Sequence, residues 1–310
     1  MKTIFKKYFS NSVNTKENVT LIGLGNMGYK MAVNLSKKFV VSGFDLNKEA
    51  VESFHKLPNT LKHETIESAV KKSTFIITML DKTSTVDKVW KDILNFNLEK
   101  NPYVVDSSTI NPIVSKQLCS LFESKGIKSA DAPVSGGVTG AEKGTLTFMV
   151  GCKESDFKGL EMYLNPMGSR IFNCGEYGTG QIAKLCNNMA LGAINSVVGE
   201  SLSLGYKLGM NMEKLVNIMK VSSSNNNVLH DFNPVPGLNP NASSSRDYER
   251  GFRIELMDKD MTLALELADQ VKADLKVSKM ASQYYKTIIK DGKKDKDFTY
   301  TYDCMIKNKI

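Results

Sequence analysis

Residues 19–28 read Val-Thr-Leu-Ile-Gly-Leu-Gly-Asn-Met-Gly, an apolar run followed by three glycines in a G-x-G-x-x-G pattern. The run predicts a buried strand, and the amphipathic stretch from Met27 to Lys38 predicts the helix that follows it. In such a unit Gly23 permits the tight turn, Gly25 lets a pyrophosphate approach the backbone, and Gly28 lets the helix pack on the strand. The helix N-terminus then offers N–H groups to phosphate. The stretch therefore predicts a dinucleotide-binding fold.

A carboxylate lies where this fold places a ribose ligand. Asp45 follows the second apolar run, residues 39–44, roughly 20 residues beyond the glycines. It can accept hydrogen bonds from both ribose hydroxyls, and it would repel a 2′-phosphate. We therefore expect NAD rather than NADP as the cofactor. The alternative is a glycine-rich turn beside a surface aspartate.

Short apolar runs alternate with helical patterns as far as about residue 170. The predicted helices include residues 65–72 and 111–125, the second with Asn111 as its cap, Pro112 in its first turn and Gly126 at its end. This alternation predicts an α/β fold of the Rossmann type, with a doubly wound, mostly parallel sheet. The predicted strands are residues 19–22, 39–44, 74–80, 103–106, 127–133 and 146–150.

Helical patterns replace the alternation after Gly180, and no strand is expected after about Asn173. We predict an NAD-binding Rossmann domain at residues 18–180 and an all-helical substrate and oligomerisation domain at residues 181–310. The segment 222–251 is irregular and rich in Ser, Asn and Pro, and a loop of this length is usually functional or mobile. The predicted helices of this half are residues 181–208, 213–221, 254–273 and 278–289.

The first 17 residues differ from the rest of the chain. Lys2, Lys6 and Lys7 alternate with apolar residues, and no acidic residue precedes Glu17. A helix here would be amphipathic and basic, which is typical of a mitochondrial presequence. The alternative is a frayed terminus with incidental lysines. We expect a presequence at residues 1–17.

Composition excludes several classes of protein. Hydrophobic residues make up 41% and charged residues 24%, as in ordinary globular proteins. The longest strongly apolar runs fall far short of the ~20 residues of a spanning helix, so we expect no membrane partner. The net charge of +8 comes from lysines, with only four arginines, so we expect no nucleic-acid partner. The five cysteines predict reduced thiols, and the three histidines lack ligand spacing, so we expect no metal.

Polar segments follow the predicted strands at their carboxyl ends, where open α/β sheets bind ligands. Residues 79–81 (Met-Leu-Asp) and 107–109 (Ser-Ser-Thr) are two such segments. The Thr109 hydroxyl can serve either a ligand or the cap of the next helix. Residues 131–137 read Asp-Ala-Pro-Val-Ser-Gly-Gly, and the adjacent glycines with the Ser135 hydroxyl can hold a small carboxylate. The alternative for this segment is a tight turn.

Residues 178–188, Gly-Thr-Gly-Gln-Ile-Ala-Lys-Leu-Cys-Asn-Asn, open the long helix. Lys184 and Asn188 are four residues apart, so they share one face, among apolar neighbours. A lysine pointing into such a face is costly unless it has a partner or a function, and its ammonium suits acid–base chemistry. The alternative is a snorkelling lysine. The pair Lys259-Asp260 lies in another apolar helix, where a charged helix face is the alternative.

Four segments together resemble the signatures of the β-hydroxyacid dehydrogenases, in the same order and spacing over most of the chain. Within this family, residues 106–112 (DSSTINP) and 233–237 (NPVPG), with the presequence-like start, are most similar to mitochondrial members that act on 3-hydroxyisobutyrate. The resemblance implies NAD-dependent oxidation of 3-hydroxyisobutyrate to methylmalonate semialdehyde, a step of valine breakdown in the mitochondrial matrix, by a homodimer or homotetramer. The segments are GLGNMG at 23–28, DAPVSGG at 131–137 with AEKGTLTFMVG at 141–151, GTGQIAKLCNN at 178–188 and KDMTLALE at 259–266.

The resemblance also implies residue roles. Lys184 corresponds to the family's catalytic lysine, and the substrate-binding positions correspond to Ser135, Gly136, Gly137 and Asn188. The implied cofactor contacts are Gly23, Gly25, Asn26, Met27, Gly28, Asp45, Leu80, Asp81, Thr85, Thr109, Lys259 and Asp260. The sequence departs from the family pattern where Asp81 replaces Pro and Cys152 replaces Gly. The resemblance assigns no role to Arg246 or Arg250.

Two alternative functions fit the same segments. The first is a related member of the family, such as a tartronate semialdehyde or succinic semialdehyde reductase; Asp45 disfavours the NADP-preferring reductases. The second is a catalytically idle member that serves as a binding module. The presence of Lys184 disfavours this second alternative.

Overall fold

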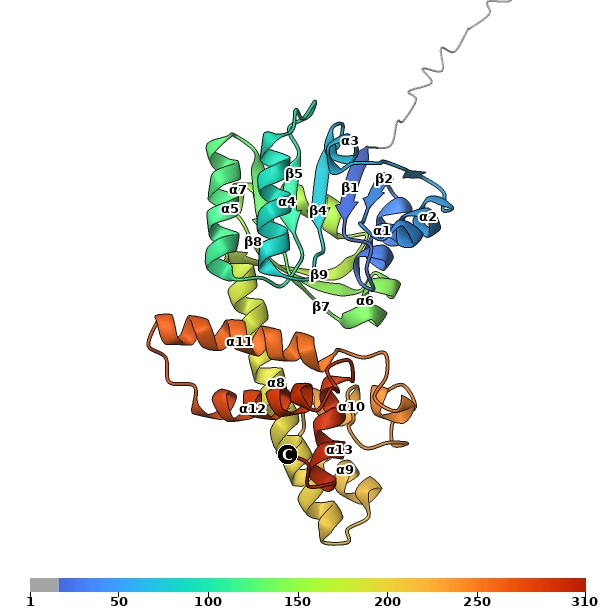
Figure 1. Ribbon diagram of the computed structural model, residues 1–310, viewed down its shortest axis with the longest axis vertical. Coiled ribbons are helices and arrows are strands. Elements are labelled where there is room, and N and C mark those ends of the chain that lie inside the picture. The colour runs from blue at the N-terminus through green and yellow to red at the C-terminus, as the bar shows by residue number, and fades with distance from the viewer. Residues whose placement is uncertain (1–16) are drawn as a thin grey trace, which may run out of the picture.

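The computed structural model describes residues 17–310, so the predicted presequence, apart from Glu17, lies outside the described residues. Figure 1 shows a part built around a sheet, which we call the sheet domain, and a part built of helices, which we call the helical domain. The helix α8 (Thr179–Lys207) joins them, because it starts beside the sheet and runs on through the helical domain.

Nine strands of the described chain form one sheet: β1 (Asn18–Ile22), β2 (Val40–Phe44), β3 (Thr60–Leu61), β4 (Phe75–Thr78), β5 (Tyr103–Asp106), β6 (Lys128–Asp131), β7 (Val134–Ser135), β8 (Leu146–Gly151) and β9 (Gly168–Gly175). Their order is β3-β2-β1-β4-β5-β6-β8-β7, with β9 paired to β8. The strands from β3 to β6 are parallel, and β8 is antiparallel to β6 and β7. The predicted Rossmann-type, mostly parallel sheet is confirmed.

Helices flank this sheet, and the local sequence explains where the best defined of them begins. The Asn111 side chain caps α5, accepting hydrogen bonds from the N–H groups of Ile113 and Val114, and Pro112 occupies the first turn. Gly126, just past the helix end, has a φ of 73°, so the predicted start and end of this helix are confirmed. The flanking helices are α1 (Gly28–Ser36), α2 (Lys48–His55), α3 (Ile66–Val70), α4 (Thr83–Asn95), α5 (Pro112–Ser124), α6 (Gly137–Lys143) and α7 (Glu154–Leu164).

In the helical domain, shorter helices pack around α8. The helices α11 and α12 cross α8, and α13 lies along it (Figure 1). Gly192 allows the close approach of α11, because a Cβ there would lie 2.7 Å from the Met261 sulfur. No helix within residues 17–310 is long and apolar enough to cross a membrane. The elements are α9 (Met212–Val221), α10 (Asn227–His230), α11 (Ile254–Gln270), α12 (Lys276–Lys290), α13 (Thr301–Ile306) and the 3₁₀ turns η1 (Ser243–Arg246) and η2 (Phe298–Tyr300).

The structure differs from the sequence-based expectation in two places. The strand β9 was not among the predicted strands, because most of its side chains are exposed or half-buried and it carries no apolar run. The segment 222–251 is not simply a long irregular loop, since it contains α10 and η1. Val228 and Leu229 of this segment are buried against Val198 and Leu202 of α8. The expectation of an irregular segment was therefore wrong for this packed part, and whether the segment has a function stays a prediction.

Candidate functional site

The glycine turn after β1 is shaped by close contacts within the protein. A Cβ on Gly23, whose φ is 102°, would lie 2.2 Å from the Met79 carbonyl oxygen, and one on Gly28 would lie 1.8 Å from the Gly23 carbonyl oxygen. A Cβ on Gly25 would have no protein atom within 4 Å. Packing thus requires Gly23 and Gly28, while open space above Gly25 fits a pyrophosphate. The N-cap residue of α1, Met27, makes no capping side-chain hydrogen bond, so the first turn of the helix suits phosphate.

Asp45 lies directly after β2 and beside this turn. Its Oδ2 accepts a hydrogen bond from Leu24 N at 2.6 Å, and its Oδ1 accepts one from Asn47 N at 2.7 Å. The side chain is half-buried, and each carboxylate oxygen keeps a further lone pair. The carboxylate therefore holds the turn in place and still fits the two hydroxyls of a ribose.

Lys259 of α11 joins the helical domain to the loops after β4 and β5. Its Nζ donates to the carbonyl oxygens of Thr109 at 2.8 Å and Asp81 at 3.4 Å. The Asp81 side chain accepts a hydrogen bond from the Thr85 hydroxyl at 2.9 Å, so this loop is tied to the first turn of α4. The structure thus brings Asp81, Thr85, Thr109 and Lys259 together. The hydroxyl of Thr109 does not cap α5, because Asn111 does.

A buried hydrogen-bond network around Asp106 holds these two loops in place. The Asp106 carboxylate accepts hydrogen bonds from the hydroxyls of Thr78 at 2.7 Å and Ser108 at 2.6 Å. The Ser108 oxygen in turn accepts the Leu80 N–H at 2.8 Å. Burial raises the pKa of Asp106 to about 6, against the lowering effect of the two hydroxyl hydrogen bonds. The position of the Leu80 backbone therefore depends on a buried carboxylate in the next strand.

The segment from Ser135 to Gly137 forms a turn between β7 and α6. Gly136 has a φ of 125° and Gly137 one of 60°, which only glycine adopts readily. Both glycines are exposed, and Ser135 is half-buried. The turn is a tight one, and it also leaves its polar groups accessible to a small carboxylate.

Lys184 lies on α8 with only 9% of its surface exposed. Asp260 of α11 is 2% exposed, and it accepts a hydrogen bond from the Asn188 side chain at 2.6 Å. The Lys259 Nζ lies 3.4 Å from the other Asp260 oxygen. Burial lowers the pKa of Lys184, while the Asp260 charge opposes and the Lys259 charge adds to this effect. Such burial disfavours both the snorkelling lysine and the solvated charged face.

One buried side chain near the site was not singled out in the sequence. Gln181 of α8 donates from Nε2 to the Ser108 carbonyl oxygen at 2.8 Å and accepts the Ile110 N–H at 3.1 Å. It therefore fastens the start of α8 to the loop after β5. A glutamine among apolar helix residues was the available signal. Cys152, the departure from the family pattern, is buried in the core of the sheet domain.

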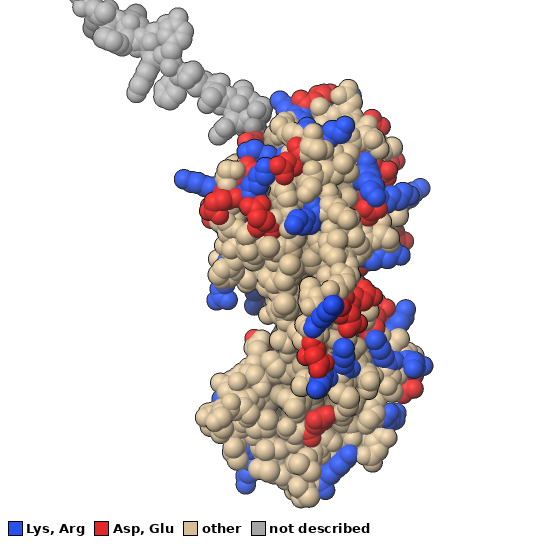
Figure 2. Space-filling model, turned by 90° about the vertical axis from the view of Figure 1, so that its left-hand side faces the viewer, with Lys and Arg blue, Asp and Glu red and all other residues tan. Residues whose placement is uncertain are grey.

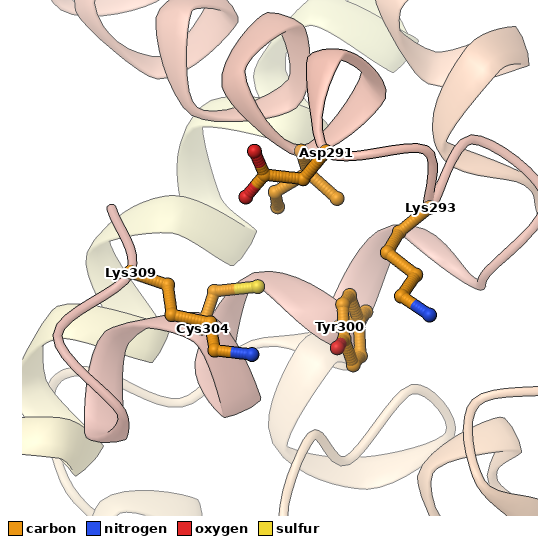
Figure 3. Close-up of a pocket in the computed structure, with 6 residues that line it drawn as sticks. Asp291, Lys293, Tyr300, Cys304 and Lys309 are labelled. Carbon is orange, nitrogen blue, oxygen red and sulfur yellow. The ribbon is translucent and has the colours of Figure 1, made fainter.

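A pocket of about 430 Å³ lies elsewhere, in the helical domain (Figure 3). None of the predicted site residues lines it. Its wall combines one carboxylate and two ammonium groups with a tyrosine and a buried thiol. Its lining residues are Ile288, Asp291, Lys293, Tyr300, Cys304 and Lys309.

The glycine turn, the ribose-type carboxylate and the buried lysine beside the sheet define the class of nicotinamide-cofactor dehydrogenases. Residues 18–175 match the family model described as the NAD binding domain of 6-phosphogluconate dehydrogenase, and residues 178–305 match that described as NAD-binding of NADP-dependent 3-hydroxyisobutyrate dehydrogenase. The mitochondrial 3-hydroxyisobutyrate dehydrogenase of Drosophila melanogaster is 38% identical to this chain, and the match covers 95% of this chain and 91% of that protein. The enzyme of the same name from Homo sapiens is 36% identical, over 96% of this chain and 89% of that protein. The chain belongs to the 3-hydroxyisobutyrate dehydrogenase family.

Solved structures agree with this assignment. The Mycobacterium tuberculosis 3-hydroxyisobutyrate dehydrogenase, solved with L-serine, is 33% identical, with a TM-score of 0.87 over 94% of this chain and 99% of that one. The Plasmodium falciparum 6-phosphogluconate dehydrogenase is 16% identical, with a TM-score of 0.65 over 93% of this chain and 69% of that one. The second likeness concerns the fold alone. The predicted membership of the β-hydroxyacid dehydrogenases is confirmed.

Proposed function

We propose that this chain oxidises (S)-3-hydroxyisobutyrate to methylmalonate semialdehyde with NAD, as a step of valine breakdown. The observation that carries the proposal is the buried Lys184, placed on α8 near the Asn188–Asp260 pair. Relatives named 3-hydroxyisobutyrate dehydrogenase, at 36–38% identity over nearly the whole chain, support the choice of substrate.

The proposed roles follow from the chemistry of each group. The nicotinamide supplies the hydride acceptor when it is bound. Lys184 takes or relays the hydroxyl proton and stabilises negative charge on the substrate oxygen. Because its pKa is lowered, a larger fraction of Lys184 is neutral and able to accept a proton. Asn188, fixed by Asp260, orients the substrate, and Ser135 with the amides of residues 136–137 binds the carboxylate.

The proposal divides the work between the two parts of the chain. Residues 18–180 bind the cofactor, and residues 181–310 supply Lys184, Asn188, Lys259 and Asp260. The proposed cofactor contacts lie from Gly23 to Gly28, at Asp45 and in the loops after β4 and β5, and they are completed by Lys259 and Asp260 of α11. NAD is proposed over NADP because the Asp45 carboxylate would lie against a 2′-phosphate.

The proposed substrate is a short, unphosphorylated acid. Recognition of a phosphate usually requires arginine forks or clustered lysines. Arg253 is already paired with Glu255 at 2.8 Å and Asp295 at 3.3 Å. Arg246 donates to backbone carbonyl oxygens of its own loop. These pairings support a site for one carboxylate and one hydroxyl rather than for a phosphosugar.

We also propose a mitochondrial matrix enzyme that assembles as a homodimer or homotetramer. The relatives named above are described as mitochondrial, and residues 1–17 have the composition of a presequence. Figure 2 shows that one side of the helical domain carries almost no charge. Large apolar side chains are exposed on its helices, which supports an interface between copies. They include Val197, Leu204, Ile218, Val277 and Met280.

A substrate panel tests the function. With purified protein and NAD, we expect kcat/KM for 3-hydroxyisobutyrate to exceed that for 6-phosphogluconate clearly. Tartronate semialdehyde and succinic semialdehyde, assayed with NADH and NADPH, test the alternative members of the family. Faster turnover of either semialdehyde than of the proposed pair, or equal use of the phosphosugar, would overturn the proposal.

A further inference from the structure

The long helix α8 has no capping side chain of its own. Its N-cap residue is Gly178, with a φ of 88°, and the N–H groups of a first helical turn need acceptors from elsewhere. Asp131, the last residue of β6, supplies them. Its Oδ1 accepts the Gly178 N–H at 2.6 Å, and its Oδ2 accepts the Gln181 N–H at 2.8 Å. The helix is thus capped by a carboxylate from the sheet.

Two glycines from separate motifs make room for this carboxylate. A Cβ on Gly151, at the end of β8, would lie 2.4 Å from the Asp131 Oδ1. One on Gly180 would lie 2.8 Å from the Oδ2 and 2.2 Å from the Met149 carbonyl oxygen. Both glycines therefore serve the contact between Asp131 and α8. Their presence needs no bound ligand to explain it.

The same turn of α8 is held a second time by the Gln181 side chain, which binds the backbone of the loop after β5. Gln181 precedes Lys184 by three residues, which is about one helical turn. Asp131 also begins the segment that leads to Ser135. Its carboxylate is therefore connected both to the helix that carries the lysine and to the turn proposed to hold the substrate.

We propose that Asp131 is a positioning residue, which holds the first turn of α8 so that Lys184 stands at a fixed place relative to Ser135 and the cofactor loops. The proposal rests on the proposed function for the part played by Lys184. Asp131 is 0% exposed, and burial raises its pKa to about 7 in spite of the two N–H donors. Keeping a carboxylate in such a place costs stability, a cost that is frequent at functional sites.

The first test is Asp131→Asn, which keeps one oxygen acceptor and turns an amide N–H₂ group toward the second N–H. We expect kcat for 3-hydroxyisobutyrate to fall by roughly 10- to 100-fold through misplacement of the lysine. The dissociation constant for NAD should change by less than about twofold, since the glycine turn is untouched.

Thr20→Val is the matched control. Thr20 lies on β1 of the same sheet, and the change removes its buried hydrogen bonds to the Ala69 carbonyl oxygen of α3 and to the Ser73 hydroxyl. It should lower the melting temperature and leave kcat per folded molecule unchanged. If Asp131→Asn also lowers only the melting temperature and keeps the wild-type kcat, Asp131 is merely structural and the proposal fails.

A second measurement does not depend on any substrate. Hydrogen exchange followed by mass spectrometry on peptides covering residues 176–185 should show slow exchange in the wild type. Exchange there should be about tenfold faster or more in Asp131→Asn, and unchanged in Thr20→Val. If the wild-type protein does not oxidise 3-hydroxyisobutyrate, the proposed function fails, while this readout still decides whether Asp131 holds the first turn of α8. Wild-type exchange in this segment as fast as in residues 136–137 would overturn the proposal, even if Asp131→Asn did not fold.

Discussion

At the scale of single residues, burial of an ammonium group on a helix costs free energy, so such a group usually has a charged partner or a catalytic role. Lys184 lies near Asp260, whose charge opposes the effect of burial on the lysine pKa, and near Lys259, whose charge adds to that effect. The balance lowers the pKa of Lys184, which favours the neutral form that can accept a proton.

Lys184→Ala should therefore remove turnover and leave the cofactor site intact. Loss of an acid–base group costs on the order of 10²–10⁴ in rate. Steady-state kinetics give kcat, and quenching of protein fluorescence by NADH gives cofactor binding. A variant that keeps more than about half of the wild-type kcat would show that Lys184 has another role.

Asp45→Ser should shift the choice of cofactor. The variant loses the carboxylate proposed to accept from the ribose hydroxyls and no longer repels a 2′-phosphate. We expect kcat/KM to fall with NAD and to rise with NADP. Because Asp45 also accepts the Leu24 N–H, Asp45→Asn is the control that keeps a side chain of the same shape. An unchanged preference for NAD in both variants would mean that Asp45 does not face the ribose.

At the scale of elements, the glycines of the turn between β1 and α1 have different tasks: Gly28 is needed for packing, and Gly25 is proposed to make room for the cofactor. Gly28→Ala forces a Cβ against the Gly23 carbonyl oxygen, and we expect a loss of roughly 3 kcal/mol or more in the free energy of unfolding. Gly25→Ala meets no protein atom, so stability should change by less than about 0.5 kcal/mol. Its cofactor affinity should fall by about tenfold or more, about 1.4 kcal/mol. Normal NAD binding by Gly25→Ala would show that the pyrophosphate does not bind at this turn.

The buried network around Asp106 predicts that the stability of the protein depends on pH. The folded pKa of Asp106, about 6, lies above the ordinary aspartate value of 3.8, so the folded state binds more protons between about pH 4 and 6. The contribution of this carboxyl to stability therefore falls as the pH rises through that window. Relative to the wild type, Asp106→Asn should gain about 1 kcal/mol between pH 5 and 7.5 in urea unfolding. Parallel stability curves for the two proteins would contradict the shifted pKa.

Sequence patterns predicted the elements whose signals are local. The glycine turn after residues 19–22 and the Asn111 cap of α5 depend on neighbours within a few residues. The strand β9 has no such signal, because its side chains are largely exposed and its pairing with β8 depends on the rest of the sheet. The same applies to the capping of α8 by Asp131, which joins residues 47 and 50 positions apart.

At the scale of the whole molecule, α8 connects the sheet domain to the helical domain. Its first turn is fixed to the loop after β5 by Gln181, and further along it Gly192 packs against Met257 and Met261 of the helical domain. The lysine of α11, Lys259, adds a second connection to the loops of the sheet. The proposed site is therefore assembled only when both parts are folded together.

The mitochondrial targeting signal is predicted to lie in residues 1–17. Residues 1–20 fused to a fluorescent reporter should direct the reporter to mitochondria, because a basic amphipathic segment is the signal for import. A fusion with Lys2, Lys6 and Lys7 replaced by glutamine is the control, and it should stay in the cytosol. Diffuse fluorescence from the unaltered fusion would favour a frayed terminus instead.

The central claim is hydride transfer from 3-hydroxyisobutyrate to NAD at the site around Lys184. The most direct measurement is NADH fluorescence after mixing the purified protein with NAD and (S)-3-hydroxyisobutyrate. We predict a rise that continues over many turnovers, is much weaker with NADP, and is lost in Lys184→Ala. No NADH from the folded wild-type protein that binds NAD, or an equal rise from Lys184→Ala, would contradict the account.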